Sequence, residues 1–266
     1  MTIGELFDGI GINNGVLAVV RAALDASACQ NPDWIYAVGG FVAQPEVWDE
    51  VLPEWQAAID QWRIPRFHLS QLPKLVGRQN AKTCEKYFLD IIENSHLHSI
   101  GGAIFTKDWK RPNWGDDTSP RFATPYEQSL WFALKVLAEH CRKAFPGEEV
   151  VVVSDFDGSE AAINRIFQKA KAEWPWLDTL ALRDASKLEL QCADLAAGIL
   201  RQSWVEITTN PDCKVPWGRL PLTKSKKTSS SVWSRRQGVI VSRAINQHLE
   251  LQRQEIERCE GRFKRD

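Results

Sequence analysis

Four acidic residues of this chain lie at the ends of predicted strands and helices or inside a predicted buried helix. Asp25 and Asp155 each follow an apolar segment, Glu127 lies in the first turn of a predicted helix, and a late helix contains the fourth acid, Asp194. Carboxylates that converge from separate elements bind Mg²⁺ or Mn²⁺ through oxygen. Two such ions, about 3.5–4 Å apart, stabilise the attacking and leaving oxygens of a phosphodiester. The four acids therefore predict metal-dependent phosphodiester cleavage if the fold brings them together.

Asp194 lies in the middle of residues 186–201, which are predicted to form a buried helix. Ser186 and Glu189 make an S-x-x-E pattern, which predicts a capping box at its start. No basic residue lies three or four positions from Asp194, so this carboxylate needs a metal ion, a hydrogen bond or a cation from another element. Apolar residues recur at helical spacing on both sides of the segment, as expected for a buried helix: Leu188, Cys192, Leu195 and Ile199 on one side, and Leu190, Ala193, Ala197 and Leu200 on the other.

The other three acids each have a second interpretation. Residues 124–127 predict a helix with Thr124 at the N-cap, so Glu127 is either a metal ligand or the closing residue of a capping box. Asp157 would point to the same side as Asp155 if the strand continued; Asp155 is preferred because it directly follows the apolar run. Asp25 is either a ligand or the start of a turn.

His68 and a basic C-terminal segment are the remaining candidates. His68 lies in a predicted loop after a proline, where it is a structural histidine or a general acid/base or substrate contact. Residues 201–266 hold 14 Lys and Arg against 7 Asp and Glu, whereas the first 200 residues hold 19 against 27. We expect the basic end to bind nucleic acid; a solvated, partly helical tail is the alternative. The residues expected to contact phosphates are Lys224, Lys226, Lys227, Arg235 and Arg236.

The elements that must position these residues alternate between strands and helices. Their order is strand, strand, helical insert, strand, helix, strand, helix, strand, helix, which predicts an α/β fold. Ligands of such sheets bind outside the carboxyl ends of the strands, where Asp25 and Asp155 fall. Gly39-Gly40 predicts a bulge or a close approach in the second strand. The expected strands are 15–24, 34–43, 99–106, 150–153 and 177–182, and the expected helices are 47–62, 81–94, 124–142, 159–174 and 186–201.

Composition excludes several other classes of protein. With 266 residues and 25% charged residues, the chain is expected to be a soluble globular domain, alone or with an appendage. It has no run of about 18 apolar residues, so no membrane span is expected. The six cysteines form no C-x-x-C pair, which argues against zinc and disulfide frameworks. Residues 1–5 lack the features of a signal peptide, so a cytoplasmic location is expected.

Several segments resemble the family called domain of unknown function 3800, of the ribonuclease-H-like superfamily. Residues 190–195, Leu-Gln-Cys-Ala-Asp-Leu, with Ser186 before them, resemble its "S…LQxADL" signature. Residues 34–42 resemble its Gly-Gly strand, residues 67–68 its F/I-H segment and residues 152–155 its second Asp strand. The match covers roughly residues 15–204, with a helical insert at about 45–95, and leaves 205–266 as a basic, partly helical extension. Members of this family are prokaryotic or phage proteins.

The resemblance implies a ribonuclease-H-like mixed sheet flanked by helices and metal-dependent cleavage of DNA or RNA. Asp25, Glu127, Asp155 and Asp194 would hold one or two Mg or Mn ions, and a metal-bound water would be the nucleophile. The family usually has Asp-Glu-Ser-Gly at the first strand, where this chain has Asp-Ala-Ser-Ala at residues 25–28. With Ala26 and Ala28 in place of the family's Glu and Gly, two alternatives remain open. One is a non-catalytic module that binds nucleic acid or protein, and the other is a small-molecule hydrolase using the same pocket.

Overall fold

The computed structural model describes residues 19–28, 35–106, 122–155 and 160–209. The chain divides into two units, Met1–Pro216 and Trp217–Asp266, and every described residue belongs to the first. No helix in these ranges is long and apolar enough to cross a membrane. The elements are, in chain order, β1 (Val19–Ala28), β2 (Ile35–Ala43), α2 (Pro45–Trp62), η1 (Leu69–Gln71), α3 (Leu72–Leu75), α4 (Arg78–Asn94), β3 (His98–Phe105), α6 (Pro125–Ala144), β4 (Glu149–Asp155), α7 (Glu160–Glu173), β5 (Leu177–Arg183) and α8 (Leu188–Thr209).

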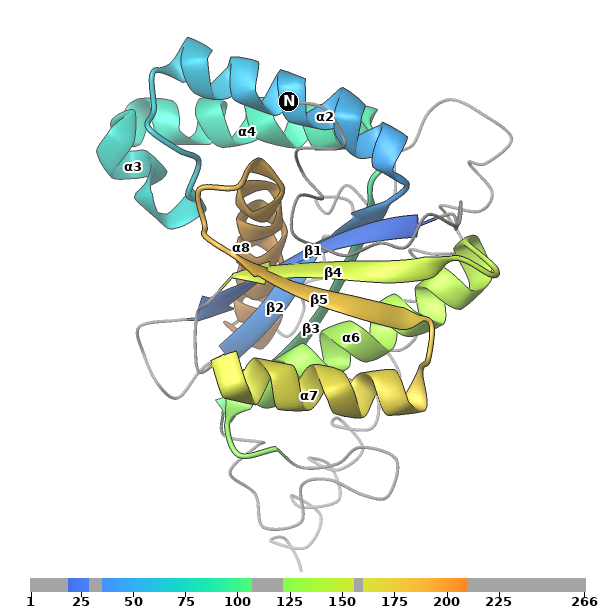
Figure 1. Ribbon diagram of the computed structural model, residues 1–266. Coiled ribbons are helices and arrows are strands. Elements are labelled where there is room, and N and C mark those ends of the chain that lie inside the picture. The colour runs from blue at the N-terminus through green and yellow to red at the C-terminus, as the bar shows by residue number, and fades with distance from the viewer. Residues whose placement is uncertain (1–18, 29–34, 107–121, 156–159, 210–266) are drawn as a thin grey trace, which may run out of the picture. The chain divides into compact units, whose positions relative to one another are not determined.

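The strands of this unit form one mixed sheet in the order β3-β2-β1-β4-β5. β2 runs antiparallel to β1 and β3, whereas β4 runs parallel to both β1 and β5. Parallel neighbours require a crossover connection, and α7 supplies it between β4 and β5 (Figure 1). The predicted α/β class is confirmed: a mixed sheet is flanked by helices, and a helical insert follows the second strand.

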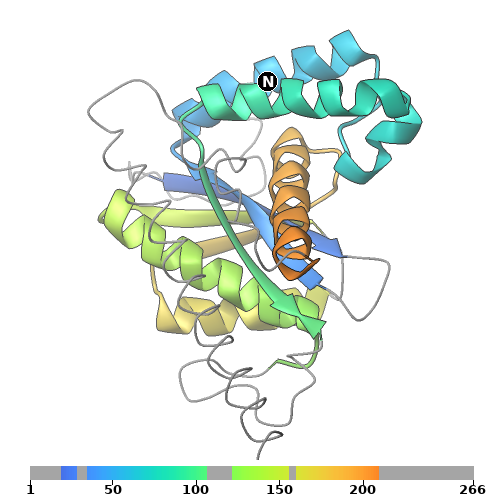
Figure 2. The same ribbon diagram turned by 180° about the vertical axis from the view of Figure 1, so that it is seen from behind.

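Helices cover both faces of the sheet. α6 and α7 pack on one face and α8 crosses the other, as the two opposite views show (Figures 1 and 2). Val20, Ala22 and Leu24 of β1 belong to the core beneath α6 and α7. Because side chains alternate along a strand, Asp25 points to the face that α8 covers. The core residues of β1 and the candidate site residue Asp25 thus lie on opposite faces of the sheet.

Glycines let the helices approach this sheet closely. A Cβ atom at Gly39 in β2 would lie 2.8 Å from the Cα atom of Ala197 in α8. On the other face, a Cβ atom at Gly102 in β3 would lie 2.6 Å from the backbone nitrogen of Ala133 in α6. The pairing of β2 with β1 continues without interruption through Gly39 and Gly40. Of the two predictions for this glycine pair, the close approach is therefore confirmed and the bulge is wrong.

The helical insert comprises α2, η1, α3 and α4, which lie on the side of the sheet that α8 covers (Figure 1). The predicted helices at 47–62 and 81–94 correspond to α2 and α4. Trp55 of α2, Phe88 of α4 and Phe67 of the intervening loop form an aromatic cluster with ring centroids 4.5–5.1 Å apart. All three are almost fully buried. This cluster anchors the loop before η1, which contains His68, to the insert.

The first strand ends later than predicted. β1 extends through Ala28, so Asp25 lies inside the strand and not after it. The extension is stabilised by β2, because the β1–β2 pairing continues from Asp25 opposite Gly39 to Ala28 opposite Tyr36. The prediction of a turn starting at Asp25 is therefore wrong. The pairing that extends β1 involves a strand that lies later in the chain, so residues 15–28 by themselves give no sign of it.

The buried helix is confirmed, but its predicted capping box is wrong. Every residue from Glu189 to Leu200 is buried. α8 begins at Leu188, and the Ser186 backbone takes part in the preceding turn. The Ser186 N–H donates to the Asp184 carboxylate at 2.8 Å, and its carbonyl accepts from Nε2 of Gln191 at 2.9 Å. Asp184 caps the turn that leads out of β5, which leaves Ser186 outside the N-cap position.

Candidate active site

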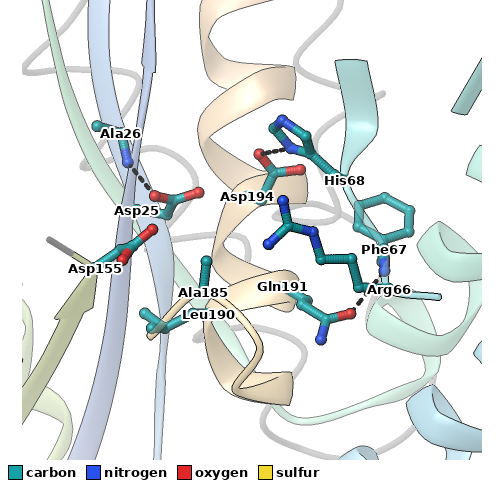
Figure 3. A pocket seen from close by; sticks show the side chains of 10 residues that line it. All are labelled: Asp25, Ala26, Arg66, Phe67, His68, Asp155, Ala185, Leu190, Gln191 and Asp194. Carbon is teal, nitrogen blue, oxygen red and sulfur yellow. Dashed lines mark hydrogen bonds and ion pairs between the residues drawn. The ribbon is translucent and has the colours of Figure 1, made fainter. Parts of the chain in front are cut away.

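A pocket of about 200 Å³ lies between the sheet, α8 and the loop before η1 (Figure 3). Four of the residues predicted to be functional line it, and they come from four different segments: Asp25 from β1, Asp155 from β4, Asp194 from α8 and His68 from the loop. The other lining residues are Ala26, Arg66, Phe67, Ala185, Leu190 and Gln191. The fold thus brings together three carboxylates and an imidazole that are far apart in the sequence.

Parallel pairing places Asp25 beside Asp155. β1 and β4 are adjacent parallel strands, and their register aligns Leu24 with Ser154. Asp25 and Asp155 are the next residue of each strand, so both carboxylates reach the pocket from neighbouring positions at the carboxyl end of the sheet. Oδ1 of Asp25 accepts a hydrogen bond from the backbone N–H of Ala26 at 2.8 Å. Ala26, the next residue, lines the pocket without adding a carboxylate.

Hydrogen bonds from the loop before η1 and from the first residue of η1 stabilise the Asp194 carboxylate. Oδ1 lies 2.9 Å from Nδ1 of His68, and Oδ2 accepts from the backbone N–H of Leu69 at 2.6 Å. A carboxylate only accepts, so Nδ1 of His68 carries the proton that is shared with Asp194. This hydrogen bond raises the pKa of His68 above its usual value, against the opposing effect of partial burial. The His68 side chain is 36% exposed and the Asp194 side chain 12%.

A further hydrogen bond fixes the same loop to α8. Oε1 of Gln191 accepts from the backbone N–H of Phe67 at 2.7 Å in a buried position. Gln191 precedes Asp194 by three residues, which places both side chains on one face of the helix. Consecutive loop residues are therefore bonded to one face of α8. In the sequence, Gln191 is an uncharged neighbour of Asp194 and part of the family signature, and its spacing from Asp194 is the signal that indicates a shared face.

Glu127 does not line this pocket. The N–H of Glu127 donates to Oγ1 of the N-cap residue Thr124 at 3.1 Å, which confirms the predicted cap. Its own carboxylate accepts from the N–H of Ala123 at 3.1 Å and pairs with Arg165 of α7 at 3.2 Å. The carboxylate is therefore engaged at the start of α6, and its role as a metal ligand stays a prediction. Asp157 and the basic residues 224–236 lie outside the described residues.

The pocket offers a divalent cation the oxygen ligands that it prefers. Mg²⁺ at phosphoryl-transfer sites is usually held by one or two carboxylates together with waters and substrate phosphates. Asp25 and Asp155 supply such a pair, and each Asp194 oxygen keeps an acceptor position beyond its observed hydrogen bond. In the part of the chain that the structure describes, no three His, Cys, Asp or Glu side chains are arranged to hold one ion. Two protein carboxylates, from Asp25 and Asp155, are thus the ligands that the pocket would offer to a Mg or Mn ion.

No protein family model matches this chain, and neither does any curated protein. Among solved structures, Bst RNase HIII in complex with Mn²⁺ is similar at 9% identity and a TM-score of 0.42, over 83% of this chain and 70% of that chain. RNase HII from Archaeoglobus fulgidus, in a complex with PCNA, is similar at 12% identity and a TM-score of 0.39, over 85% and 89% of the two chains. The ribonuclease H2 from Pyrococcus horikoshii OT3 is similar at 10% identity and a TM-score of 0.36, over 82% and 98%. These identities are too low to transfer an activity to this chain.

Proposed function

We propose that this chain is a Mg- or Mn-dependent nuclease of the ribonuclease-H-like superfamily, belonging to the family called domain of unknown function 3800. The observation that carries the proposal is the convergence of Asp25, Asp155 and Asp194 with His68 on one pocket at the carboxyl end of a mixed sheet. A pocket with three acidic side chains repels an anionic substrate unless cations neutralise it. A metal ion would supply that neutralisation and activate a water for attack on phosphorus.

Each pocket residue has a separate task in this proposal. Asp25 inside β1 and Asp155 at the end of β4 occupy neighbouring positions and hold the cation from the sheet side. Asp194 faces the pocket from α8 and orients the imidazole of His68 through the 2.9 Å hydrogen bond. His68 is sufficiently exposed to reach a substrate and to give a proton to the leaving oxygen. Nucleic acid, DNA or RNA, is the proposed substrate.

The alternative is a module of the same fold that binds nucleic acid or protein without cleaving it. Ala26 favours this alternative, because it lines the pocket where the family pattern places a glutamate. The two functions differ in turnover and not in fold. Cleavage by the purified parent chain would decide between them.

Incubation of the purified chain with labelled DNA and RNA panels, in Mg²⁺, Mn²⁺ or EDTA, tests the proposal. We expect cleavage with either metal and none in EDTA. Asp25→Asn and Asp155→Asn should each reduce turnover about 100-fold or more, since a metal contributes several kcal/mol to the transition state. Both should also weaken Mn²⁺ binding measured by calorimetry, which does not depend on activity. Asp194→Asn should reduce turnover while the fold, checked by circular dichroism, stays intact.

Asp90→Asn is the matched control for these variants. Asp90 is a surface aspartate of α4 that pairs with Lys86 at 2.6 Å, outside the pocket. Its substitution removes the same charge and should change neither turnover nor Mn²⁺ affinity. Retention of parental cleavage by Asp25→Asn and Asp155→Asn, or cleavage by the parent in EDTA, would exclude the metal mechanism.

A further inference from the structure

Arg66 is a basic residue in an otherwise acidic pocket. Its side chain extends from the loop before η1 toward the acidic side chains (Figure 3). It makes no hydrogen bond or ion pair with any of the residues that the structure describes, although its charge acts on His68 and Asp184. An arginine that lies beside three carboxylates yet pairs with none of them keeps its five N–H donors available for a ligand. Arg66 was not among the candidates that the sequence suggested.

The backbone around Arg66 is fixed. The next residue, Phe67, is 1% exposed and packs against Trp55 and Phe88. Its N–H donates to Gln191 at 2.7 Å, and the N–H of Leu69 donates to Asp194 at 2.6 Å. These contacts hold the loop on α8 on both sides of His68. The base of the Arg66 side chain therefore keeps its place relative to the acidic residues, and a ligand group that it bound would be oriented with respect to them.

The chemistry of arginine identifies the group that it would bind. Its planar guanidinium donates two parallel hydrogen bonds to a phosphate or a carboxylate. A carboxylate substrate would add one more negative charge beside Asp25, Asp155 and Asp194. Such a substrate would also leave the pair of candidate metal ligands without a function. A phosphodiester has two non-bridging oxygens, and one can face the guanidinium while the other faces the cation at Asp25 and Asp155. Because Arg66, Asp25 and Asp155 line the same pocket, a single phosphate there could be reached from both groups.

We propose that Arg66 binds a non-bridging oxygen of the substrate phosphate and orients that phosphate against the Asp25–Asp155 pair. This inference rests on the nuclease function proposed above and adds a substrate-binding residue to it. Arg66 contacts the backbone of the nucleic acid, so its contribution is the same for all base sequences.

Binding and cleavage by Arg66→Ala, Arg66→Lys and the control Arg78→Ala test this inference. Arg78 is an exposed residue at the start of α4, outside the pocket, and its removal changes the net charge equally. The probe is a fluorescently labelled oligonucleotide that the parent chain binds, in Ca²⁺ for anisotropy and in Mg²⁺ or Mn²⁺ for cleavage. Thermal melts confirm that each variant is folded, which we expect because Arg66 is exposed and makes no hydrogen bond within the described chain.

We expect Arg66→Ala to raise the Kd and the KM roughly 10- to 100-fold, the usual effect of removing a hydrogen bond to a charged group. The slope of log affinity against log salt should flatten by roughly 0.7–0.9, the contribution of one phosphate contact. The Kd and KM of Arg66→Lys should lie between those of the parent and those of Arg66→Ala. Lysine keeps the charge but cannot donate two parallel hydrogen bonds. Mn²⁺ affinity without oligonucleotide should not fall, which separates Arg66 from the metal ligands.

Two results would overturn the inference alone: oligonucleotide affinity of Arg66→Ala equal to that of the parent, or an equal decrease in Arg78→Ala. Either would leave the proposed nuclease function standing if the parent still cleaves. A parent chain that binds none of the DNA and RNA probes would overturn both the proposed function and this inference.

Discussion

At the scale of single residues, Glu127 carries two different predictions, a residue of the helix cap and a metal ligand. Its backbone N–H donates to Thr124, and its carboxylate, 7% exposed, accepts from Ala123 and Arg165. These contacts account for its burial without a metal ion. The Thr124 cap is therefore observed, with the carboxylate bonded to the N–H of Ala123, one residue before the N-cap. The ligand role would require the carboxylate to leave its present partners.

Substitution of Glu127 separates the two roles. Glu127→Gln keeps an acceptor for Ala123 and removes the ion pair with Arg165, whose side chain is 63% exposed. We expect this change to cost less than about 1 kcal/mol of unfolding free energy. Glu127→Ala removes the acceptor as well and should cost about 1–2 kcal/mol. If Glu127 belongs only to the cap, Mn²⁺ affinity and turnover should be parental in the Gln variant. A clear decrease of Mn²⁺ affinity in that variant, measured by calorimetry, would make Glu127 a ligand.

His140 is predicted to make the stability of the protein depend on pH. Burial lowers the pKa of His140 from 6.5 to about 3, and the nearby charges of His98 from β3 and Lys143 from α6 act in the same direction. Its Nε2 atom is buried and has no hydrogen-bond partner among the described residues. His140 is thus neutral in the folded protein at pH values where it is protonated in the unfolded chain.

The sign of this effect follows from the lowered pKa. Above about pH 6.5 the residue is neutral in both states; as the pH falls toward 3, the unfolded chain binds the extra proton. The free energy of unfolding should therefore decrease by up to about 1.4 kcal/mol per pH unit in that window. His140→Phe should flatten this dependence in urea titrations at a series of pH values. Equal slopes in parent and variant would show that other groups dominate the acid sensitivity.

At the scale of elements, the pocket depends on how closely α8 lies on the sheet. Gly39 permits this approach, because any side chain there would meet the backbone of Ala197. Gly198, in α8 itself, is a useful comparison. A Cβ atom there would lie 2.4 Å from Cδ2 of Leu69, which is the far end of a flexible side chain. Gly39 thus faces a rigid backbone, whereas Gly198 faces a side chain that can move.

The two alanine substitutions should differ in their cost. Gly39→Ala pushes α8 off the sheet and should reduce the unfolding free energy by about 1–3 kcal/mol or more. Gly198→Ala requires Leu69 to move, but alanine in a helix gains about 1 kcal/mol over glycine, so the net change should be small. Urea unfolding of both variants measures the difference. If Gly198→Ala destabilises as much as Gly39→Ala, Leu69 is as rigid as the helix backbone.

At the scale of the whole molecule, charge is divided between an acidic body and a basic end. Residues 201–266 contain 14 Lys and Arg and 7 Asp and Glu. The residues predicted to contact phosphates, Lys224, Lys226, Lys227, Arg235 and Arg236, lie outside the described residues, so their role is a proposal from sequence alone. Such a segment would supply affinity for nucleic acid that the acidic pocket does not.

Neutralising these five basic residues tests that role. Replacement by Gln should weaken binding of all oligonucleotide sequences alike, because phosphate contacts carry no base preference. The slope of log affinity against log salt should flatten by roughly 0.7–0.9 for each phosphate that the variant no longer neutralises. Anisotropy titrations from low to moderate salt measure both effects. Unchanged affinity and slope would assign the segment to solvent or to a protein partner.

The sequence by itself determined the five strands, the five long helices and four of the ten residues that line the pocket. The four-valine run predicted the buried strand β4, which lies in the interior of the sheet, and apolar residues on both sides of residues 186–201 predicted the buried helix α8. These are local signals, since periodicity and burial are encoded within one element. His68 and Asp194 were each indicated by their own segments, without any sign that they meet.

Tertiary structure decided which of these residues meet and what each contacts. The separation of His68 and Asp194 by 126 positions gave no sign of their hydrogen bond. The neighbouring positions of Asp25 and Asp155 follow from the parallel register of β1 and β4, which no local pattern specifies. The burial of Glu127 against Arg165 and the entry of Arg66 into the pocket depend likewise on packing between elements. Local sequence specifies a residue's element and its face, whereas its neighbours across the fold are set by pairing and packing between distant segments.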